Sequence, residues 1–365
     1  MKDIRHVAES FDLPGKIVSV DECRTGHINS TFFIKCEDGS KYVLQKINTG
    51  IFKDPDGLMR NIFGVTGFIR GKLKASGLDP DRGTLRFIPL KDGKLFFRDS
   101  DGEAYRVYRF VDHVVSLQSA DTPDILKSVG VAFGGFAMML ADYDVSTLCE
   151  TIPRFHDTES RYSDFLATLE ADPAGRASEI PYEIGFVQSR RELCSYIVSG
   201  IREGKFPLRV THNDTKLNNI LLDEKTLRPV CVIDLDTVMP GSVLYDFGDA
   251  VRFAASTAAE DSDDYPNVRL DTEKFTALAE GFIEGFAGTL TLPELKALPM
   301  GALVITFETG MRFLKDYLDG DVYFRTDYPG HNLVRARNQF ALARDVESRL
   351  SELDSIVDRL ISERG

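Results

Sequence analysis

The stretch that decides the fold covers residues 210–241 and reads VTHNDTKLNNILLDEKTLRPVCVIDLDTVMPG. Asp214 is followed five residues later by Asn219, and Asp234 comes fifteen residues after that asparagine. A short apolar run follows Asn219 and another precedes Asp234, each with the length and composition of a strand. Two strands that meet at one loop would bring Asn219 and Asp234 together, so the spacing predicts one shared site.

The residue types at this spacing are those that phosphoryl transfer requires. An aspartate on a loop, here Asp214, can accept the proton of a substrate hydroxyl, and Asn219 and Asp234 can hold Mg²⁺ against the phosphates of ATP. Asp236 projects to the same side as Asp234 if the strand continues, as a second metal ligand or as a hydrogen-bonding partner of the loop. Each residue alone is common in turns, so the joint spacing carries the prediction.

This arrangement resembles the aminoglycoside phosphotransferase and choline kinase group, relatives of the protein kinases, in which His-Gly-Asp-x-x-x-x-Asn is followed by Ile-Asp. Asn213 stands here in the glycine position. The runs THNDTKLNNILLD, VIDLDTVMPGSVLYDFGDAVRF and GMRFLKDYLDGDVYF are similar to the N-acetylhexosamine 1-kinases, over nearly the whole chain. The resemblance implies a bilobal, protein-kinase-like fold and transfer of a phosphoryl group from ATP, with Mg²⁺, to the anomeric hydroxyl of such a sugar.

The hydrophobic pattern predicts an α+β fold with an N-terminal lobe at residues 1–110 and a C-terminal lobe at residues 111–365. In the first lobe we expect an antiparallel sheet with one inserted helix, because alternating runs are joined by Asp-Gly turns. Its expected strands lie at residues 16–20, 30–36, 41–45, 85–89, 94–97 and 104–109, and its helix at 57–75. The second lobe reads as mostly helical, with helices near residues 124–140, 190–203, 273–286, 292–318 and 338–360 and an acidic loop at 260–268.

The loop between the first two strands is the candidate phosphate-covering loop. The resemblance assigns Gly26, His27, Ser30 and Thr31 to the nucleotide, although the same loop could be a hairpin with a polar tip. It also places the hinge, whose backbone meets the adenine, at residues 110–113, with Phe110 and Asp112 as contacts; without the resemblance, this segment reads as a strand end without a ligand.

The lysine that protein kinases carry on the third strand is absent here. Gln45 occupies its place, the neighbouring Lys46 points to the opposite face of the sheet, and the following helix has no glutamate near its start. Either Gln45 bonds the phosphates as a neutral donor, or another cation such as Arg60 or Lys216 supplies charge.

The acceptor end falls at residues 310–324. In the resembled sugar kinases an arginine and a tyrosine at this spacing face the sugar, which assigns Arg312 and Tyr323 to the substrate, with Phe247 as a weaker candidate and Asp214 as the base that orients its hydroxyl. The alternative is that Arg312 pairs with Asp316 along its own helix.

Further residues are predicted to support the catalytic loop. His212 is expected to brace it through the backbone or Asp234, whereas Asp246 and Asp249 are expected to hold it or to pair with Arg252. The tripeptide Asp246-Phe247-Gly248 imitates the metal-binding motif of protein kinases, but the metal aspartate of the resembled family aligns with Asp234.

Composition limits the remaining possibilities. The net charge of −13 argues against nucleic acid and anionic membranes as partners, and five scattered cysteines favour a reducing cytoplasm. We expect a monomer or weak homodimer that binds ATP and a small sugar. The alternatives left open are a kinase of choline, homoserine, methylthioribose or an aminoglycoside, and a nucleotide-binding regulator without activity, which the missing lysine–glutamate pair would suit.

Overall fold

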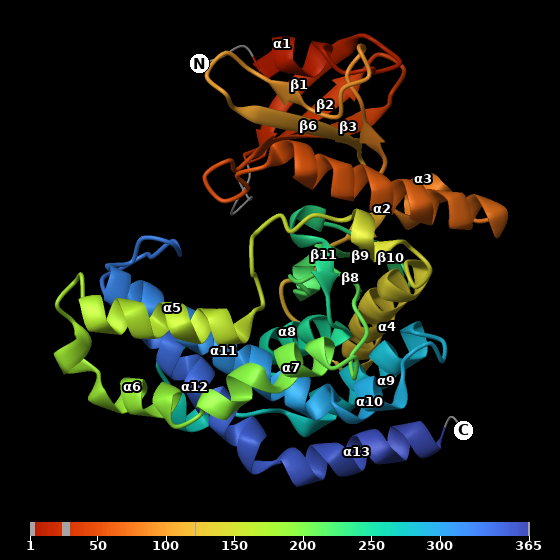
Figure 1. The fold of residues 1–365 in the computed structure, drawn as a ribbon. Coiled ribbons are helices and arrows are strands. Elements are labelled where there is room, and N and C mark those ends of the chain that lie inside the picture. The colour runs from red at the N-terminus through yellow and green to blue at the C-terminus, as the bar shows by residue number, and fades with distance from the viewer. Residues whose placement is uncertain (1–3, 24–29, 121, 364–365) are drawn as a thin grey trace. The chain divides into compact units, whose positions relative to one another are not determined.

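The computed structural model describes residues 4–23, 30–120 and 122–363 of the 365-residue chain. The chain divides into two compact units (Figure 1). The first, here called the sheet unit, comprises Met1–Val115, Asp142–Pro153 and Leu221–Pro240. The second, the helical unit, comprises Ser116–Ala141, Arg154–Ile220 and Gly241–Gly365. The sheet unit therefore takes in two later segments that a boundary at residue 110 does not include.

An antiparallel sheet forms the centre of the sheet unit. Its strand order is β1-β2-β3-β6-β4, and β5 pairs with β6 beside β4. The strands are β1 (Ile17–Cys23), β2 (Thr31–Cys36), β3 (Lys41–Ile47), β4 (Phe87–Ile88), β5 (Phe97–Arg98) and β6 (Ala104–Arg109). The turn between β2 and β3 needs Gly39, whose φ of 83° is costly for other residues. Ile34, Leu44 and Val107 are fully buried in the core of this sheet.

Three helices accompany this sheet: α1 (Ile4–Glu9), α2 (Pro55–Ala75) and α3 (Pro80–Gly83). The start of α2 is encoded locally, because the Asp54 side chain accepts from the N–H of Gly57 at 3.0 Å and Pro55 occupies the first turn. Such a cap satisfies a backbone donor that the helix itself leaves open. The expected helix at 57–75 is thus confirmed with a start two residues earlier.

The later segments of the sheet unit add a second, smaller sheet in the order β10-β9-β7. Its strands are β7 (Val114–Val115), β9 (Ile220–Asp223) and β10 (Pro229–Val232), followed by the short helix η5 (Leu235–Thr237) and by β11 (Met239–Gly241). The segment of residues 142–153 contains η1 (Val145–Thr147).

The helical unit is held together by helices that pack closely. Figure 1 shows α11 running through this unit beside α12 and α8. A side chain added at Gly130 of α4 would meet the carbonyl oxygen of Leu278 in α9 at 2.3 Å, so glycine is required for this contact. The elements are α4 (Pro123–Met139), α5 (Thr158–Ala171), η2 (Ala177–Glu179), α6 (Pro181–Gln188), η3 (Arg191–Ser195), α7 (Tyr196–Arg202), β8 (Arg209–Thr211), η4 (Leu217–Asn219), α8 (Val243–Ala254), η6 (Tyr265–Asn267), α9 (Thr272–Gly285), α10 (Leu292–Lys296), α11 (Leu298–Asp319), α12 (His331–Ser348) and α13 (Leu350–Ser362).

The predicted fold class is confirmed: an antiparallel sheet comes first and a larger helical part follows. Two long predicted helices are each divided, one at Ala297, which caps α10, and one at Arg349, which ends α12. Periodicity missed these breaks because the apolar positions continue across them, as with the buried Val346 and Leu353. Helix α8 was not predicted at all.

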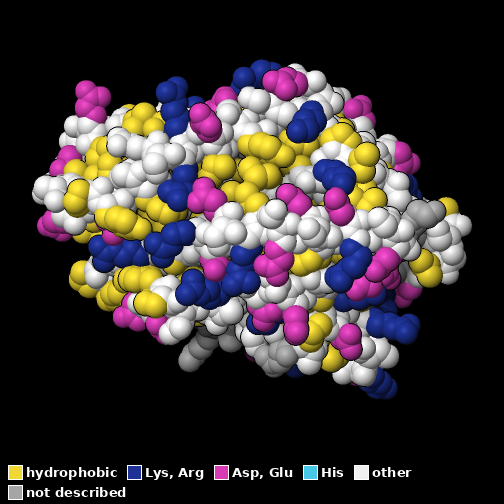
Figure 2. All heavy atoms as spheres, turned by 90° about the horizontal axis from the view of Figure 1, so that it is seen from below, with side chains coloured by type: hydrophobic (Ala, Val, Ile, Leu, Met, Phe, Trp, Pro, Cys, Tyr) yellow, Lys and Arg dark blue, Asp and Glu magenta, His cyan; other side chains and the backbone are white. Residues whose placement is uncertain are grey.

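The surface carries charges of both signs. Figure 2 shows Lys and Arg side chains interspersed with Asp and Glu and with apolar side chains on the face toward the viewer. Acidic residues outnumber basic ones by 57 to 44, which gives the net charge of −13. Within the described ranges, every helix is too short or too polar to span a membrane.

Candidate active site

The candidate catalytic loop follows β8 in the helical unit and leads to β9, and a carboxylate of α8 fixes its backbone. The N–H groups of His212 and Asn213 donate to Asp246 at 2.9 and 2.7 Å. Asn213 has a φ of 62°, in the left-handed region where glycine and asparagine are the easiest residues. This backbone conformation explains why the resembled family has glycine at the position of Asn213.

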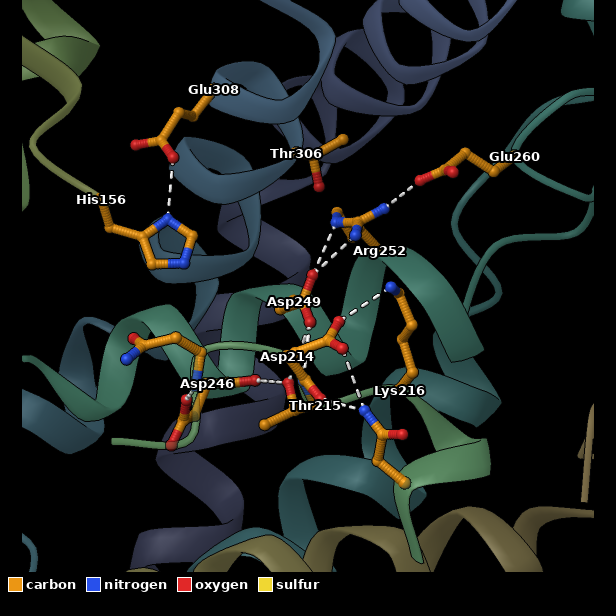
Figure 3. A network of polar contacts seen from close by, with 12 residues as sticks. His156, Asp214, Thr215, Lys216, Asp246, Asp249, Arg252, Glu260, Thr306 and Glu308 are labelled. Carbon is orange, nitrogen blue, oxygen red and sulfur yellow. Dashed lines mark hydrogen bonds and ion pairs between the residues drawn. The ribbon is translucent and has the colours of Figure 1, made fainter. Parts of the chain in front are cut away.

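Asp246 is buried, and burial raises its pKa to about 6 against the opposing effect of its hydrogen bonds. Its neighbour Asp249, one helical turn on, accepts from the N–H of Thr215 at 2.7 Å. Arg252 lies 2.7 Å from Asp249 and also pairs with Glu260 (Figure 3). Both aspartates of α8 thus hold the loop from behind.

Asp214 is the residue that these contacts position. Nζ of Lys216 lies 2.8 Å from its Oδ1, and Nδ2 of Asn219 donates to its Oδ2 at 3.0 Å and to its carbonyl oxygen at 2.9 Å. Burial alone would raise the pKa of Asp214, but the charge and hydrogen bond of Lys216 outweigh it, and the pKa lies below its usual value. Asp214 is therefore an ionised, oriented carboxylate.

His212 is fully buried beneath this loop. Its Nδ1 accepts from the N–H of Asp214 at 3.3 Å, and its ring packs edge-on against Phe133 and Phe136 of α4. The ring thus braces the Asp214 backbone from the core side.

The side-chain amide of Asn219 has an orientation that suits a cation ligand. Its nitrogen donates to two oxygens of Asp214, which turns its carbonyl oxygen away from that residue. Amide and carboxylate oxygens are the ligands that Mg²⁺ prefers. Among the described residues no group of three or more His, Cys, Asp or Glu side chains could hold a metal. A kinase-type site, in which phosphate oxygens supply further ligands, does not require one.

Asp234 and Asp236 belong to the sheet unit, and here one expectation is corrected. The strand does not continue beyond β10: Asp234 has a φ of 59°, and η5 begins directly after it. Because the period of a strand no longer applies, the argument that Asp236 shares the side of Asp234 fails. The carboxylate of Asp236 pairs with Arg106 of β6, and both side chains are almost fully buried.

Gln45 lies beside the same arginine. Its Oε1 accepts from Nε and Nη2 of Arg106 at 3.1 and 2.9 Å. Lys46 points elsewhere and pairs with Glu103 at 2.9 Å, as the strand period predicts. Arg60 is exposed on α2. Sequence reasoning missed Arg106 altogether, although its place in an alternating run was a signal that it shares a face with the third strand.

The phosphate-covering loop is described only at its end. Gly26 and His27 lie outside the described residues. Ser30 is exposed, and its carbonyl oxygen accepts from the N–H of Lys46 at 2.9 Å, whereas Thr31 begins β2. Ser30 therefore lies immediately before the strand that Thr31 begins.

The hinge segment is fixed by α3. Nη1 of Arg82 donates to the carbonyl oxygen of Asp112 at 2.9 Å, and the N–H of Phe110 donates to Lys41 of β3 at 3.0 Å. The Asp112 side chain pairs with Nζ of Lys41 at 2.6 Å. The Phe110 N–H is therefore already paired, whereas the Asp112 carbonyl oxygen has a second lone pair that can still accept.

Arg312, at the expected acceptor end of the helical unit, lies over two aromatic faces. Its guanidinium carbon is 4.8 Å from the ring centroid of Phe155 and 5.6 Å from that of Phe324. Asp316, the alternative partner along the helix, accepts instead from the backbone N–H groups of residues 322–324 at 2.8–3.0 Å. Asp316 therefore shapes the loop that carries the half-exposed Tyr323.

Further polar residues near Arg312 were missed. Arg161 donates to the carbonyl oxygen of Phe155 at 3.1 and 3.0 Å. Burial and the positive charge of Arg312 lower the pKa of Arg161. One carboxylate oxygen of the buried Glu308 lies 2.7 Å from Nδ1 of His156 (Figure 3). The other accepts from the hydroxyl of Thr158 at 2.5 Å. No sequence signal pointed to these contacts, because each of the polar residues stands alone among apolar or unrelated neighbours in the chain.

The expectation that Phe247 contacts the acceptor is corrected by the structure. It is fully buried, with its ring centroid 5.7 Å from that of Phe275 and 5.2 Å from that of Phe282. Its position in α8 directs it into the core, away from the loop that Asp246 holds, because adjacent helical residues point in different directions. We therefore no longer expect it to contact the acceptor.

Comparisons with known proteins find one family model and several solved structures of similar fold. A model described as the phosphotransferase enzyme family matches residues 19–280. The structure of a microcompartment-associated aminopropanol kinase is similar, with a TM-score of 0.60, 15% identity and coverage of 96% of this chain and 98% of that chain. An amicoumacin kinase in complex with AMP-PNP, Ca²⁺ and Ami gives a TM-score of 0.60 and 15% identity over 96% and 94% of the two chains. An aminoglycoside phosphotransferase from Alicyclobacillus acidocaldarius gives a TM-score of 0.56 and 13% identity, with coverage of 97% of this chain and 96% of that chain.

Proposed function

Since the chain belongs to the phosphotransferase enzyme family, we propose that it transfers the γ-phosphoryl group of ATP to the anomeric hydroxyl of an N-acetylhexosamine and releases the sugar 1-phosphate and ADP. The observation that carries the proposal is the oriented carboxylate of Asp214 on a loop held by Asp246 and Asp249. The similarity of the fold to that of an amicoumacin kinase in complex with AMP-PNP supports ATP as the donor.

In this reaction Asp214 accepts the hydroxyl proton. The oxygen of the acceptor attacks the γ-phosphorus, the bond from that phosphorus to the bridging oxygen of ADP breaks, and the proton passes to Asp214. The transition state is loose, so proton transfer is late and orientation matters as much as basicity. Lys216 keeps Asp214 ionised and places a positive charge beside the reacting oxygens.

Asn219 and Asp234 are the proposed oxygen ligands for Mg²⁺, which would neutralise phosphate charge when bound. Asp236 is proposed to act through Arg106 instead. Phosphate binding by a protein of net charge −13 makes such local cations necessary.

Two features of the helical unit support a neutral sugar as acceptor. The stacked guanidinium of Arg312 keeps its N–H groups at its edge, where hydroxyl or acetamido oxygens can accept. Arg161 adds a second positive charge close to it. Two adjacent guanidinium groups disfavour cationic acceptors, which choline and the aminoglycosides are.

The second candidate is a kinase of another small hydroxylated molecule. It is favoured by the similarity of the fold to kinases of aminopropanol and amicoumacin, although identity of 15% supports only the fold. A regulator without activity is a weaker candidate, because Asp214, Asn219 and Asp234 are all present.

One experiment separates these functions. ADP release is measured with GlcNAc, GalNAc, choline, homoserine, methylthioribose, aminopropanol and an aminoglycoside, and ³¹P NMR then locates the phosphate. We expect turnover with the N-acetylhexosamines, none with their methyl 1-glycosides, and retained turnover with 6-deoxy analogues. Phosphate on carbon 6, or turnover confined to an amino alcohol, would contradict the proposal.

A further inference from the structure

Arg106 is a buried cation of the sheet unit whose contacts extend on both sides of its guanidinium. Its side chain is 2% exposed. It lies opposite Gln45 in the pairing of β6 with β3, and Gln45 lies opposite Thr31 in the pairing of β3 with β2. Residues directly opposite one another in a sheet share a face. The three side chains therefore form one row across the sheet, ending at the strand that follows the expected phosphate loop.

Arg106 determines which way the Gln45 amide points. A guanidinium has donors only, so it must face the amide oxygen, and both of its hydrogen bonds to Gln45 do so, at 3.1 and 2.9 Å. The amide nitrogen of Gln45 is then directed toward Oγ1 of Thr31, 3.5 Å away. Gln45 consequently presents N–H donors, and no acceptor, on the Thr31 side.

The other end of the guanidinium holds the turn after Asp234. Nη1 donates to the carboxylate of Asp236, and the same turn is tied down by Thr151, which donates to the Asp236 carbonyl oxygen at 2.8 Å, and by Asn61, which donates to that of Val238 at 3.0 Å. The turn that begins at the proposed metal ligand is thus anchored from the sheet and from α2.

The electrostatics agree with this placement. Burial alone would lower the pKa of Arg106, but the negative charges of Asp236 and Asp234 raise it. The guanidinium also lies over the ring of Phe87, 5.8 Å from its centroid. Arg106 is therefore a fixed positive charge between the amide donor and the acidic turn.

We propose that Arg106 is a positioning residue for nucleotide binding: it directs the N–H donors of Gln45 toward the phosphates and fixes the turn that carries Asp234. One buried arginine would thus replace the lysine–glutamate pair that protein kinases use. The inference rests on the proposed function in so far as the nucleotide is ATP, but it concerns nucleotide affinity and not the identity of the acceptor.

The first test is Arg106→Lys. A lysine keeps the charge, but its single ammonium cannot reproduce the planar guanidinium, which donates to Gln45 and to Asp236 at the same time. Affinity for ATP, measured by displacement of a fluorescent ATP analogue without acceptor, should fall about ten- to a hundredfold, the range for losing a hydrogen bond to a charged group. The KM for ATP should rise in parallel, while the KM for the acceptor stays within about twofold of its original value.

Arg109→Met is the matched control. Arg109 lies on the same strand and pairs with Asp81 at 2.6 Å, but its side chain is 44% exposed. Its removal should leave ATP affinity unchanged. Unchanged ATP affinity in a folded Arg106→Lys, or an equal rise in both KM values, would overturn the proposal.

Variants of Gln45 decide the question even if Arg106→Lys does not fold. Gln45→Glu keeps an oxygen for Arg106 but has no N–H donor, so ATP affinity should fall as it does in Gln45→Leu. If Arg106 acts through Gln45, the losses in Arg106→Lys and Gln45→Leu should combine to less than their sum on a free-energy scale. Normal ATP binding by Gln45→Glu, or full additivity, would overturn the inference. Wild-type protein that binds ATP but phosphorylates no acceptor would refute only the proposed function.

Discussion

Nζ of Lys216 lies 2.8 Å from Oδ1 of Asp214, two residues earlier on the same loop. The pair has two effects on one carboxylate. The ammonium keeps it ionised, which a general base requires, and it occupies one oxygen while Asn219 occupies the other. Asp214 is thus oriented by its own loop before any acceptor binds.

The first prediction concerns this base. Asp214→Asn keeps the size of the side chain but cannot accept the proton, so kcat should fall by roughly 10²–10⁴. ATP affinity should stay close to that of the wild type. Steady-state kinetics with circular dichroism as a check on folding measure both. A folded variant with most of its kcat would show that Asp214 is not the base.

The second prediction concerns the metal ligand. Asp234→Ala removes a carboxylate that alanine cannot replace, and turnover with Mg²⁺ and ATP should be lost. Asn219→Ala should reduce turnover and recover part of it at high Mg²⁺. Titration of Mg²⁺ in the ADP-release assay distinguishes the two. Near-normal rates for Asp234→Ala would require a different metal ligand.

The third prediction concerns the acceptor. Arg312→Ala and Tyr323→Phe should raise the KM for the sugar more than the KM for ATP, because both residues lie at the proposed acceptor end. A matched control is Arg325→Ala, whose exposed side chain only approaches Asp327 at 3.9 Å. If instead the KM for ATP rises and that for the sugar is constant, Arg312 and Tyr323 do not bind the acceptor.

The fourth prediction is a pH dependence of stability. Burial raises the pKa of Asp246 to about 6, above the unfolded value of about 3.9, so the folded protein binds a proton that the unfolded chain does not. This contribution is complete below pH 4 and is lost as pH rises through about 6. Wild type should therefore gain stability over Asp246→Asn between pH 7.5 and pH 5, by on the order of 1–2 kcal/mol.

Urea unfolding of both proteins at the two pH values measures this difference. Asp92→Asn is the control, because hydrogen bonds from Lys94 lower the pKa of this exposed carboxyl. A lowered pKa changes stability only as pH falls below about 4, so the difference between wild type and that variant should stay constant between pH 7.5 and pH 5. A stability difference for Asp246→Asn that does not change with pH would contradict the raised pKa.

Sequence reasoning succeeded where the chemistry is local in the chain. Asp214 and Asn219 were both selected by their spacing on one loop, and the structure adds a direct contact between their side chains that had not been predicted. The strands of the first sheet were predicted because alternation and Asp-Gly turns mark them directly. The breaks at Ala297 and Arg349 were missed because an apolar stripe does not reveal where a helix ends.

Contacts between segments far apart in the chain could not be predicted from spacing and periodicity. The bonds between Gln45 and Arg106 depend on strand register across 61 residues, and the pair of Arg106 with Asp236 spans 130. Phe247 was assigned to the acceptor because its helix was not predicted, so its direction was unknown. Side-chain direction requires the phase of the element, which spacing along a loop does not supply.

The composition of the sheet unit from three stretches of chain has a consequence for synthesis on the ribosome. Strand β7, at Val114–Val115, pairs with residues 222 and 223, and the turn held by Arg106 lies later still. The nascent N-terminal part cannot be completed until about 240 residues have been translated. Until then the guanidinium of Arg106 lacks its carboxylate. The six-stranded sheet is complete in sequence by residue 109, whereas the small sheet and the turn held by Arg106 need the later segments. The sheet unit can therefore be finished only after the chain has passed through part of the helical unit.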